Sequence, residues 1–407
     1  MNFFNLKKNK RSLVFSLAFF AYAFTASNTA QATEDWLGFK LPKSVQIHGF
    51  LSQGFIHTSD NNLFGHSDDS ISTDFRELGL NGSWRVMPEL QLALQVVWRD
   101  AGQTDEDDLR IDYGVIDYNF YSSESTSLGI KAGRVPTPLG FYNETRDIAS
   151  TRPSILLPQS IYFDRNRNMA LSADGGYFYG EQRSDYGDFL FTIGVVNPRT
   201  DDPSFKNAIV GNDRGEMKGD ASWITRLIYE WQSGLVRLAV TYGDLNAHYS
   251  PNSGATFSAG SFRFNPLIFS AQYNAENWSL TSEYAHRKMR LTDFGAFPNI
   301  KSTGESFYIQ GTYKLSRYLE ALARYDQLSV DKNDKNGDNF ASKSNATNYS
   351  RFAKDWTFGF RSNITSSLLI SAEYHRINGT AWLSNLENTT PTTQHWDLYT
   401  LLISYNF

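Results

Sequence analysis

The feature that most constrains the fold is an alternation of apolar and polar residues that recurs along most of the chain. In the segment 90–98, for example, every even-numbered residue is apolar, whereas Gln91 and Gln95 fall on the opposite face. Because successive side chains of a strand point to opposite faces, such a segment predicts a strand with one apolar side. No stretch of useful length has the period of a helix.

The connections between these segments alternate between short and long. We expect sixteen strands, at 45–57, 72–86, 90–100, 109–120, 127–135, 169–181, 186–197, 219–231, 235–244, 258–274, 277–290, 303–315, 319–330, 354–364, 368–378 and 394–407. Short turns at 87–89, 121–126, 182–185, 232–234, 275–276, 316–318 and 365–367 alternate with long loops at 58–71, 101–108, 136–168, 198–218, 245–257, 291–302, 331–353 and 379–393. This alternation predicts a closed, even-stranded, up-and-down barrel with both ends on the turn side. A count of 14 or 18 strands would fit the same topology.

Composition indicates that the barrel lies in a membrane. Hydrophobic residues make up 41% of the chain, and aromatic residues alone make up 15%. Tryptophans gather near the expected strand ends, at Trp84, Trp98, Trp223, Trp231, Trp278 and Trp356. Aromatic girdles at two interfaces are typical of transmembrane barrels, and closure avoids unpaired backbone groups, which are costly in hydrocarbon. The expected fold class is therefore all-β, a closed antiparallel up-and-down transmembrane β-barrel.

Residues 1–32 have the pattern of a signal peptide. Four basic residues precede an apolar run from Leu13 to Phe24, and Ala30-Gln31-Ala32 is typical of a cleavage site. The alternative, a membrane anchor, would need roughly 20 apolar residues. Cleavage before Thr33 removes four positive charges, which changes the formal charge from −5 to −9 and leaves 33–407 as the barrel. An acidic exported chain is not expected to bind nucleic acid.

The polar face of the strands is expected to line the lumen. Its ionisable residues carry both signs and include Arg85, Arg99, Arg226, Arg237, Arg287, Arg324, Arg361, Glu230, Glu283, Glu320 and Glu373. A water-filled pore is the simplest use for so many inward charges in a wide barrel. The alternative is that they form salt bridges that brace the wall.

The longest connection, 136–168, is too rich in apolar residues and proline for a disordered loop. Its charged residues sum to +1 and are Arg146, Arg152, Arg165, Arg167, Glu144, Asp147 and Asp164. Long loops of this kind are usually functional. We expect this third loop to fold into the lumen, its apolar residues against the wall and its charged residues towards the water, where they would form a constriction that sets ion selectivity. An external flap or a subunit-contact loop is the alternative.

The stretch KAGRVPTPLGFYNETRD, Lys131 to Asp147, resembles the Gly-Arg-x-x-x-Pro segment that precedes the third loop in porin-like proteins of Gram-negative bacteria, including relatives of phosphate-selective porins. The resemblance extends in architecture over the whole mature chain. It implies a passive diffusion channel for small hydrophilic solutes or ions in the outer membrane, often a homotrimer. The lumenal ladder of arginines and lysines that phosphate-selective relatives use cannot be mapped onto this sequence.

The chain ends on an aromatic residue in mid-pattern, with the sequence HWDLYTLLISYNF. The apolar alternates are Tyr399, Leu401, Ile403, Tyr405 and Phe407. We expect them to face lipid while the strand pairs with 45–57 to close the barrel. By resemblance, such an end is the segment read by the barrel-insertion machinery. Periplasmic chaperones and, after insertion, lipid and lipopolysaccharide are the other expected partners.

Two other functions fit a membrane barrel. An adhesin or receptor would use external loops such as 331–353, and a barrel hydrolase would need an activated Ser or Asp beside a His. The best candidate set is Ser282, Glu283 and His286, but strand parity places Ser282 and Glu283 on opposite faces. We therefore expect no enzyme activity.

No cofactor or metal is expected either. The chain has no cysteine, which excludes thiolate sites. The stretch DKNDKNGDN, residues 331–339, lacks the glycine and glutamate positions of an EF-hand loop. The seven histidines show no paired metal-ligand spacing.

Overall fold

The structure is a computed structural model that describes residues 35–36, 39–40, 42–105, 108–165, 167–200, 203–344, 346–389 and 391–407. The expected signal peptide lies outside the described residues. Two short strands, β1 (Asp35–Trp36) and β2 (Phe39–Lys40), pair with each other ahead of the barrel.

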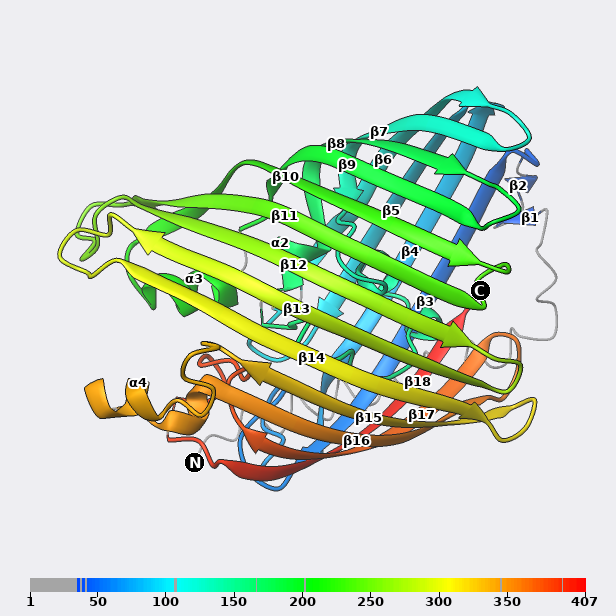
Figure 1. Ribbon diagram of the computed structural model, residues 1–407. Helices are drawn as coiled ribbons and strands as arrows, with labels where there is room; N and C mark the ends of the chain where they lie inside the picture. Colours follow the sequence, from blue (N-terminus) through cyan, green and yellow to red (C-terminus); the bar gives the residue numbers. More distant parts are fainter. Residues whose placement is uncertain are drawn as a thin grey trace.

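Sixteen antiparallel strands, β3 to β18, form one closed barrel (Figure 1). Their bounds are β3 Val45–Thr58, β4 Ser72–Met87, β5 Leu90–Asp100, β6 Asp108–Ser122, β7 Thr126–Pro136, β8 Ser172–Gln182, β9 Asp188–Pro198, β10 Gly215–Trp231, β11 Val236–Pro251, β12 Gly260–Asn274, β13 Trp278–Thr292, β14 Ile300–Lys314, β15 Leu319–Ser329, β16 Phe352–Asn363, β17 Leu368–Gly379 and β18 His395–Asn406. Each strand pairs with its neighbours in sequence, and β18 pairs with β3 to close the ring. The predicted fold class and the count of sixteen strands are confirmed.

The connections give the barrel a turn end and a loop end (Figure 1). Short turns join the strands at the turn end, where β3 begins and the chain finishes, and the long connections lie at the loop end. The loop-end connections contain the helices α2 (Arg167–Leu171), α3 (Pro203–Val210) and α4 (Asp338–Lys343) and the 3-10 helices η2 (Asn143–Thr145), η3 (Ala149–Thr151) and η4 (Asn348–Arg351). Across the described ranges, no helix has the length and apolar character needed to cross a membrane.

The strand bounds differ from expectation mainly at the loop end. Strand β8 begins at Ser172 instead of residue 169, because α2 occupies the preceding residues. Strand β11 continues to Pro251 instead of ending at residue 244. Strands β10 and β11 have 17 and 16 residues, whereas β7, β8 and β9 have 11 each, so the wall rises higher on the β10–β11 side.

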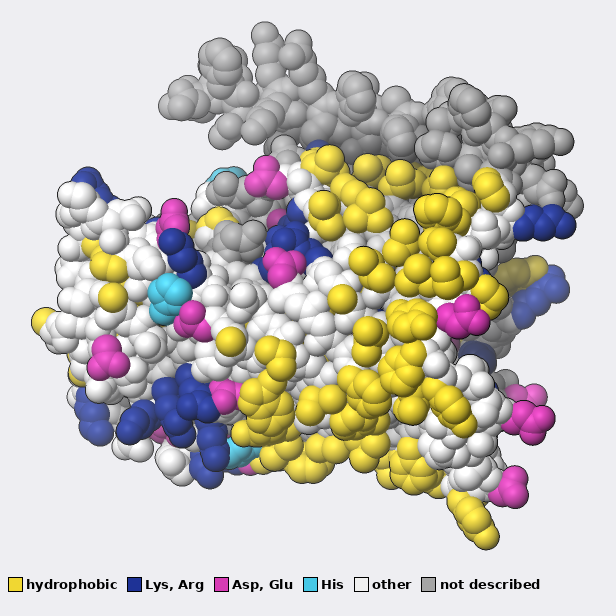
Figure 2. Space-filling model, turned by 90° about the horizontal axis from the view of Figure 1, so that it is seen from above, with side chains coloured by type: hydrophobic (Ala, Val, Ile, Leu, Met, Phe, Trp, Pro, Cys, Tyr) yellow, Lys and Arg dark blue, Asp and Glu magenta, His cyan; other side chains and the backbone are white. Residues whose placement is uncertain are grey.

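The outer face carries a band of apolar side chains between two rows of aromatic residues. Exposed aromatic residues near the turn end include Trp84, Tyr118, Trp231, Tyr273, Trp278, Tyr313 and Phe360, and those near the loop end include Trp223, Tyr242, Phe269, Tyr284, Trp356 and Tyr399. Aliphatic residues such as Leu80, Leu94 and Ile309 are exposed between the rows. Figure 2 shows hydrophobic side chains gathered on this face. Such a band is what a membrane-spanning barrel presents to lipid.

The final strand, β18, has apolar residues on both faces. Its outward residues Tyr399 and Leu401 are exposed, whereas its inward residues Trp396, Leu398 and Leu402 are buried. The inward residues belong to a core cluster that includes parts of the third loop. The last strand therefore contacts the surroundings of the barrel on one side and the third loop on the other.

The terminal aromatic ring packs over a glycine of the first barrel strand. Phe407 exchanges two backbone hydrogen bonds with Gly49, at 2.9 and 3.0 Å. A Cβ atom added to Gly49 would lie 2.2 Å from Cζ of Phe407, so the ring occupies the space that a larger residue would fill. Tyr405 stacks beside it, with 6.2 Å between ring centroids. The end of the chain thus completes the seam between β18 and β3.

Deletion of Phe407 should lower the yield of folded barrel while leaving export intact. A fully buried Phe is worth about 1.5–3 kcal/mol, and this ring is half exposed, so its loss should cost about 1 kcal/mol of stability. The folded fraction can be measured by heat-modifiable migration on gels of outer-membrane fractions. Gly49→Ala should act in the same direction by displacing the ring. Gly82→Ala is the control, because its Cβ would meet nothing nearer than 3.8 Å, and normal assembly without Phe407 would contradict this role.

Candidate functional site: the third loop and the lumen

The third loop leaves the barrel wall after β7 and crosses the lumen to the far wall. There the backbone amides of Ile155 and Leu156 donate to the carboxylate of Glu373 on β17, at 2.6 and 3.4 Å. Arg324 on β15 donates to the carbonyl oxygen of Leu156 at 3.1 Å. Arg361 on β16 donates to the carbonyl oxygens of two residues of the loop, Ser150 and Arg152. The loop is therefore attached to wall strands far from its own ends.

A second attachment lies on β13. Glu283 accepts hydrogen bonds from the hydroxyl groups of Tyr162 and Tyr308, at 2.5 and 2.8 Å, and from the backbone amide of Phe141 at 3.1 Å. Ser270 on β12 also donates to it, at 2.5 Å. Both Glu283 and Tyr308 are fully buried. A wall carboxylate thus holds two separate segments of the loop.

The densest charge cluster surrounds Glu77 on β4, whose side chain is 1% exposed. Its oxygens lie 3.1 Å from Arg99 on β5, 3.2 Å from Arg152 in the loop and 3.7 Å from Arg167 at the start of α2. Ser52 on β3 donates to it at 3.3 Å. A buried charge is tolerated only when it is paired and hydrogen-bonded. Glu77 therefore ties the third loop to the wall at β3, β4 and β5.

Further ion pairs extend the cluster within the loop. Asp164 accepts from Arg146 at 3.2 Å and lies 3.5 Å from Arg99 and from Arg167. Arg167 also pairs with Asp147. Opposite charges of the loop thus neutralise one another inside the barrel.

The short second loop supplies one more carboxylate, that of Asp105. It accepts from Arg99 at 3.0 Å and from Arg110 at 2.6 Å. Burial alone would raise the pKa of Asp105, but the two guanidinium groups outweigh burial and hold its pKa at about 2. The carboxylate therefore stays ionised over the physiological range of pH.

Our expectation that the charged residues of the loop face water is wrong for most of them. Arg146, Asp147, Arg152 and Arg167 are each less than 5% exposed, and the Asp164 side chain is 12% exposed. The physical reason is that the wall and the loop carry partners of opposite charge, so pairing replaces hydration. Glu144 is the clear exception, with 38% of its side chain exposed beside Arg226.

Arg165 differs from the other three arginines of the loop. It donates to the carbonyl oxygen of Leu383 at 3.3 Å. Among the described residues, no carboxylate oxygen lies within ion-pair distance of its guanidinium group, whereas Arg146, Arg152 and Arg167 each have such a partner. Arg165 is thus the loop arginine whose charge is left for a solute or for water.

The residues expected on the lumen wall lie on the inner face, and most of them hold the loop. Arg99, Arg226, Arg324, Arg361, Glu283 and Glu373 all contact it directly. Arg287 stacks over Phe163 of the loop at 4.9 Å. Arg237 stacks over Phe141 of the loop at 4.9 Å and also pairs with Glu230 at 2.7 Å. Arg85 is exposed near the turn end, where it donates to Gln91. Glu320 pairs in register with Arg361. From the sequence, we expect these inward charges either to line a water-filled pore or to form salt bridges that brace the wall. Attachment of the third loop is a third role for them.

Apolar residues of the loop pack against the wall, as expected. Ile155 and Leu156 join the core cluster that contains the inward face of β18, and Leu157 and Ile161 join a second cluster against β7–β10 and β12–β14. Each buried side chain of this size contributes about 1.5–3 kcal/mol. Hydrophobic packing and ion pairing therefore act together to fix the loop.

Two cavities lie on opposite sides of the loop. The larger, of about 410 Å³, is on the side of the loop end and reaches Leu139, and the smaller, of about 250 Å³, is on the side of the turn end and reaches Pro136 and Pro138. No described residue lines both. Lys131 and Asp117 face the smaller cavity, where Nζ of Lys131 lies 3.8 Å from Oδ2 of Asp117. The segment 136–139 therefore lies between the two cavities.

Sequence reasoning missed Glu77, the centre of the charge cluster. Glu77 is an even number of residues from Asn81, Ser83 and Arg85 on the same strand, so strand alternation alone would have placed it on the lumenal face with them. Nothing in the sequence indicates that it meets three arginines, because its partners come from β5, from the loop and from α2.

The other candidate sites do not come together. Ser282 and His286 lie on the outward parity of β13, and Glu283 lies on the inward one. In the stretch 331–339, the carboxylate of Asp334 accepts the backbone amides of Asn339 and Phe340 and so stabilises a turn. Among the described residues, no group of three or more His, Asp or Glu side chains is placed to hold a metal ion.

Glu77→Gln should release the third loop from the wall. Removing one partner of a buried ion pair costs about 3–5 kcal/mol, and here it leaves several arginines short of negative charge. Tryptic cleavage of the folded barrel after Arg146 and Arg167 should accelerate at least about tenfold, because local opening governs proteolysis. Glu230→Gln is the matched control, since its pair with Arg237 is partly exposed and lies apart from the cluster. Equal rates of cleavage in the wild type, Glu77→Gln and Glu230→Gln would show that Glu77 does not hold the loop.

Asp105 should make the barrel sensitive to strong acid. Its pKa in the folded protein, about 2, lies below the ordinary value of 3.8, so its stabilising contribution is complete above pH 3.8 and is lost as the pH falls towards 2. The drop in Tm between pH 5 and pH 2.5, followed by circular dichroism, should therefore be smaller in Asp105→Asn than in the wild type. The same drop in both proteins would contradict this assignment.

Comparison with known proteins rests on structure alone. No known family model and no curated protein sequence matches the chain. One similar solved structure is the outer membrane channel DcaP of Acinetobacter baumannii, with a TM-score of 0.58 and 12% sequence identity over 91% of this chain and 100% of that chain. An anion-selective porin from Comamonas acidovorans is similar with a TM-score of 0.57 and 11% identity over 89% of this chain and 99% of that chain. OmpT, an outer membrane protein of Vibrio cholerae, is similar in a trimer form, with a TM-score of 0.57 and 12% identity over 89% of this chain and 99% of that chain. At these identities the likeness concerns the fold, and the chain has the fold of outer-membrane porins and channels.

Proposed function

We propose that the protein is a porin of the outer membrane of a Gram-negative bacterium, a passive and non-enzymatic diffusion channel for small hydrophilic solutes or ions. The observation that carries the proposal is the third loop, which is fixed across the lumen with a cavity on each side. A barrel used only as a membrane anchor would not need so many inward charges. The apolar outer band and the aromatic rows support a place in the membrane.

We propose that solutes pass along the loop where its charged side chains are not fully buried. Glu144 and Arg165 are the accessible charged positions, whereas Arg146, Arg152, Arg167, Asp147 and Asp164 act indirectly by fixing the position of the loop. A narrow passage lined by charge selects solutes by size and by sign. The loop 136–168 is therefore the proposed constriction.

The assembly of the channel follows from the same proposal. Residues 1–32 would direct export and be removed, leaving 33–407 as the mature barrel. The end of β18, with Tyr399, Leu401, Ile403, Tyr405 and Phe407 facing outwards, would be read by the insertion machinery after handover from periplasmic chaperones. We also propose a homotrimer in contact with lipid and lipopolysaccharide, since one structure of the same fold is described as a trimer form.

Purified protein reconstituted in a planar bilayer should give discrete steps of current. The polar wall and the cavities on both sides of the loop are the physical reason. The measurement is single-channel conductance in KCl, with a folded sample verified by its heat-modifiable migration. Folded protein without any conductance would refute the porin proposal and favour a receptor or adhesin.

Arg165→Gln should shift the reversal potential in a KCl gradient towards cations. The substitution removes the loop charge that lacks a carboxylate partner, so the passage becomes less positive. Arg183→Gln is the matched control, because Arg183 lies on a turn, is 57% exposed in its side chain and pairs with Glu181. An unchanged reversal potential in Arg165→Gln would place the ion path elsewhere.

A further inference from the structure

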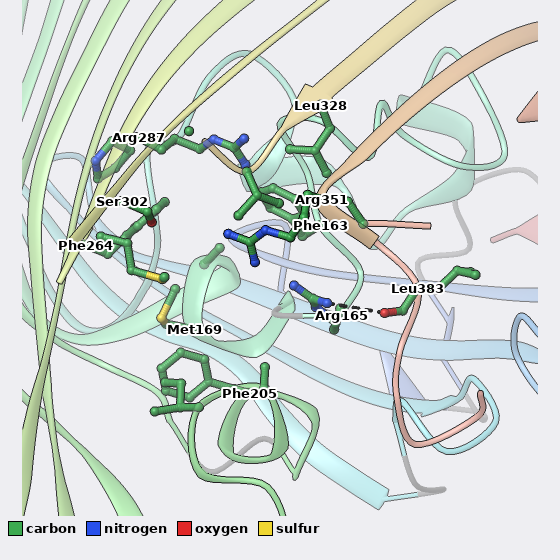
Figure 3. Close-up of a pocket in the computed structure, with 18 of the residues that line it drawn as sticks. Phe163, Arg165, Met169, Phe205, Phe264, Arg287, Ser302, Leu328, Arg351 and Leu383 are labelled. Carbon is green, nitrogen blue, oxygen red and sulfur yellow. Dashed lines mark hydrogen bonds between the residues drawn. The ribbon is translucent and has the colours of Figure 1, made fainter. Parts of the chain in front are cut away.

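The larger cavity has an unusual lining for the lumen of a channel. It lies between the third loop, α3 and the inner faces of β12–β15, on the side of the loop end (Figure 3). Its volume of about 410 Å³ falls within the range of small-molecule sites, about 300–1,000 Å³. Many of its walls are apolar side chains, and they include Met169, Phe205, Phe262, Phe264, Met289 and Leu328.

The charged part of the lining is cationic. Arg165, Arg287 and Arg351 contribute to it, and no Asp or Glu is among the described residues that line the cavity. Within the described chain, no carboxylate oxygen lies within 4 Å of any of these three guanidinium groups, unlike those around Glu77. Figure 3 shows the three arginines around one region of the cavity, drawn from the loop, from β13 and from η4.

Two of these arginines have unused hydrogen-bonding capacity. The Nε atoms of Arg165 and Arg287 are buried and have no acceptor. Arg165 and Arg351 line the same cavity, and burial together with the positive charge of Arg351 lowers the pKa of Arg165. A buried donor without an acceptor and two adjacent like charges are both costly. An anion in the cavity would relieve both costs.

The apolar wall lies opposite, on α2, α3 and β12–β13. Phe205 of α3 packs edge-on against Phe262 with 5.2 Å between the ring centroids, which holds α3 against the barrel wall. A small inorganic anion would gain nothing from this surface, whereas a hydrocarbon body would gain about 25 cal/mol for each Å² that it buries. The two surfaces together fit a molecule with one charged end and one apolar end.

We propose that this cavity binds an amphiphilic organic monocarboxylate, with its carboxylate on Arg165, Arg287 and Arg351 and its aromatic or short aliphatic body against Phe264 and Met289. Guanidinium groups bind carboxylates through paired, charge-assisted hydrogen bonds. The assignment rests on the proposed channel function and names its solute class. Such a solute would enter from the loop end and occupy the cavity before it passes the third loop.

The test compares three probes on the folded protein: 4-phenylbutyrate, the neutral 4-phenylbutan-1-ol and acetate. Titration calorimetry in detergent measures binding without any need for conductance, and interruptions of single-channel current measure occupancy during transport. We expect 4-phenylbutyrate to bind at least about tenfold more tightly than either other probe, since each supplies only one of the two interactions. Equal binding of the acid and the alcohol, equal binding of the acid and acetate, or no binding at all would overturn the assignment.

Matched variants locate the site. Arg165→Gln and Arg351→Gln should each weaken binding of 4-phenylbutyrate severalfold, and Met289→Gln should reduce the advantage of 4-phenylbutyrate over acetate. Arg351 belongs to an external connection, so its variant should fold even if others do not. Arg85→Gln is the control, because Arg85 lies near the turn end, donates to Gln91 and does not line the cavity. Undiminished binding in Arg165→Gln and Arg351→Gln would overturn the site.

The two proposals fail in different ways. A protein that binds 4-phenylbutyrate as described but never conducts would refute the channel function and leave the binding site standing. A protein that conducts normally but binds 4-phenylbutyrate no more tightly than the alcohol and acetate would refute the solute class alone.

Discussion

The arrangement of the lumen depends on charge pairing from which water is largely excluded. Glu77 on the wall and Asp164 in the loop share the guanidinium groups of Arg99 and Arg167, so the loop and the wall neutralise each other. Separating them would leave ions unpaired in a poorly hydrated place, which costs far more than an exposed pair is worth. The crossing path of the loop, the separation of the two cavities and the position of Arg165 all follow from this attachment.

The fold could be predicted because lipid imposes a simple rule on every strand. A segment that faces hydrocarbon must alternate and must pair its backbone on both edges, so the pattern fixes the strands, their order and closure. The rule stops where lipid stops. Beyond Tyr242, the outward residues of β11 are polar, as at Asp244 and Asn246, while the inward residues are apolar, as at Leu245 and Tyr249. The alternation continues with its polarity reversed, which is why the end of this strand was missed.

The site was less predictable, because parity gives the face of a residue and not its partner. The sequence places Arg324 and Glu373 in the lumen, and the structure adds that both bind the backbone of the third loop. Hydration was the wrong expectation for the loop charges, since their partners lie on strands distant in sequence. The cavity with its three arginines was equally hidden, because Arg351 comes from a connection whose path over the barrel no local pattern encodes.

The two apolar faces of β18 also constrain the order of assembly. Its outward face needs lipid, and its inward residues Trp396, Leu398 and Leu402 need the third loop already in place. Until both are present, the strand exposes apolar side chains of the kind that promote misassembly. Docking of the loop, which is synthesised long before β18, therefore precedes or accompanies closure. We therefore expect the seam of the barrel to close stably only over a correctly filled lumen.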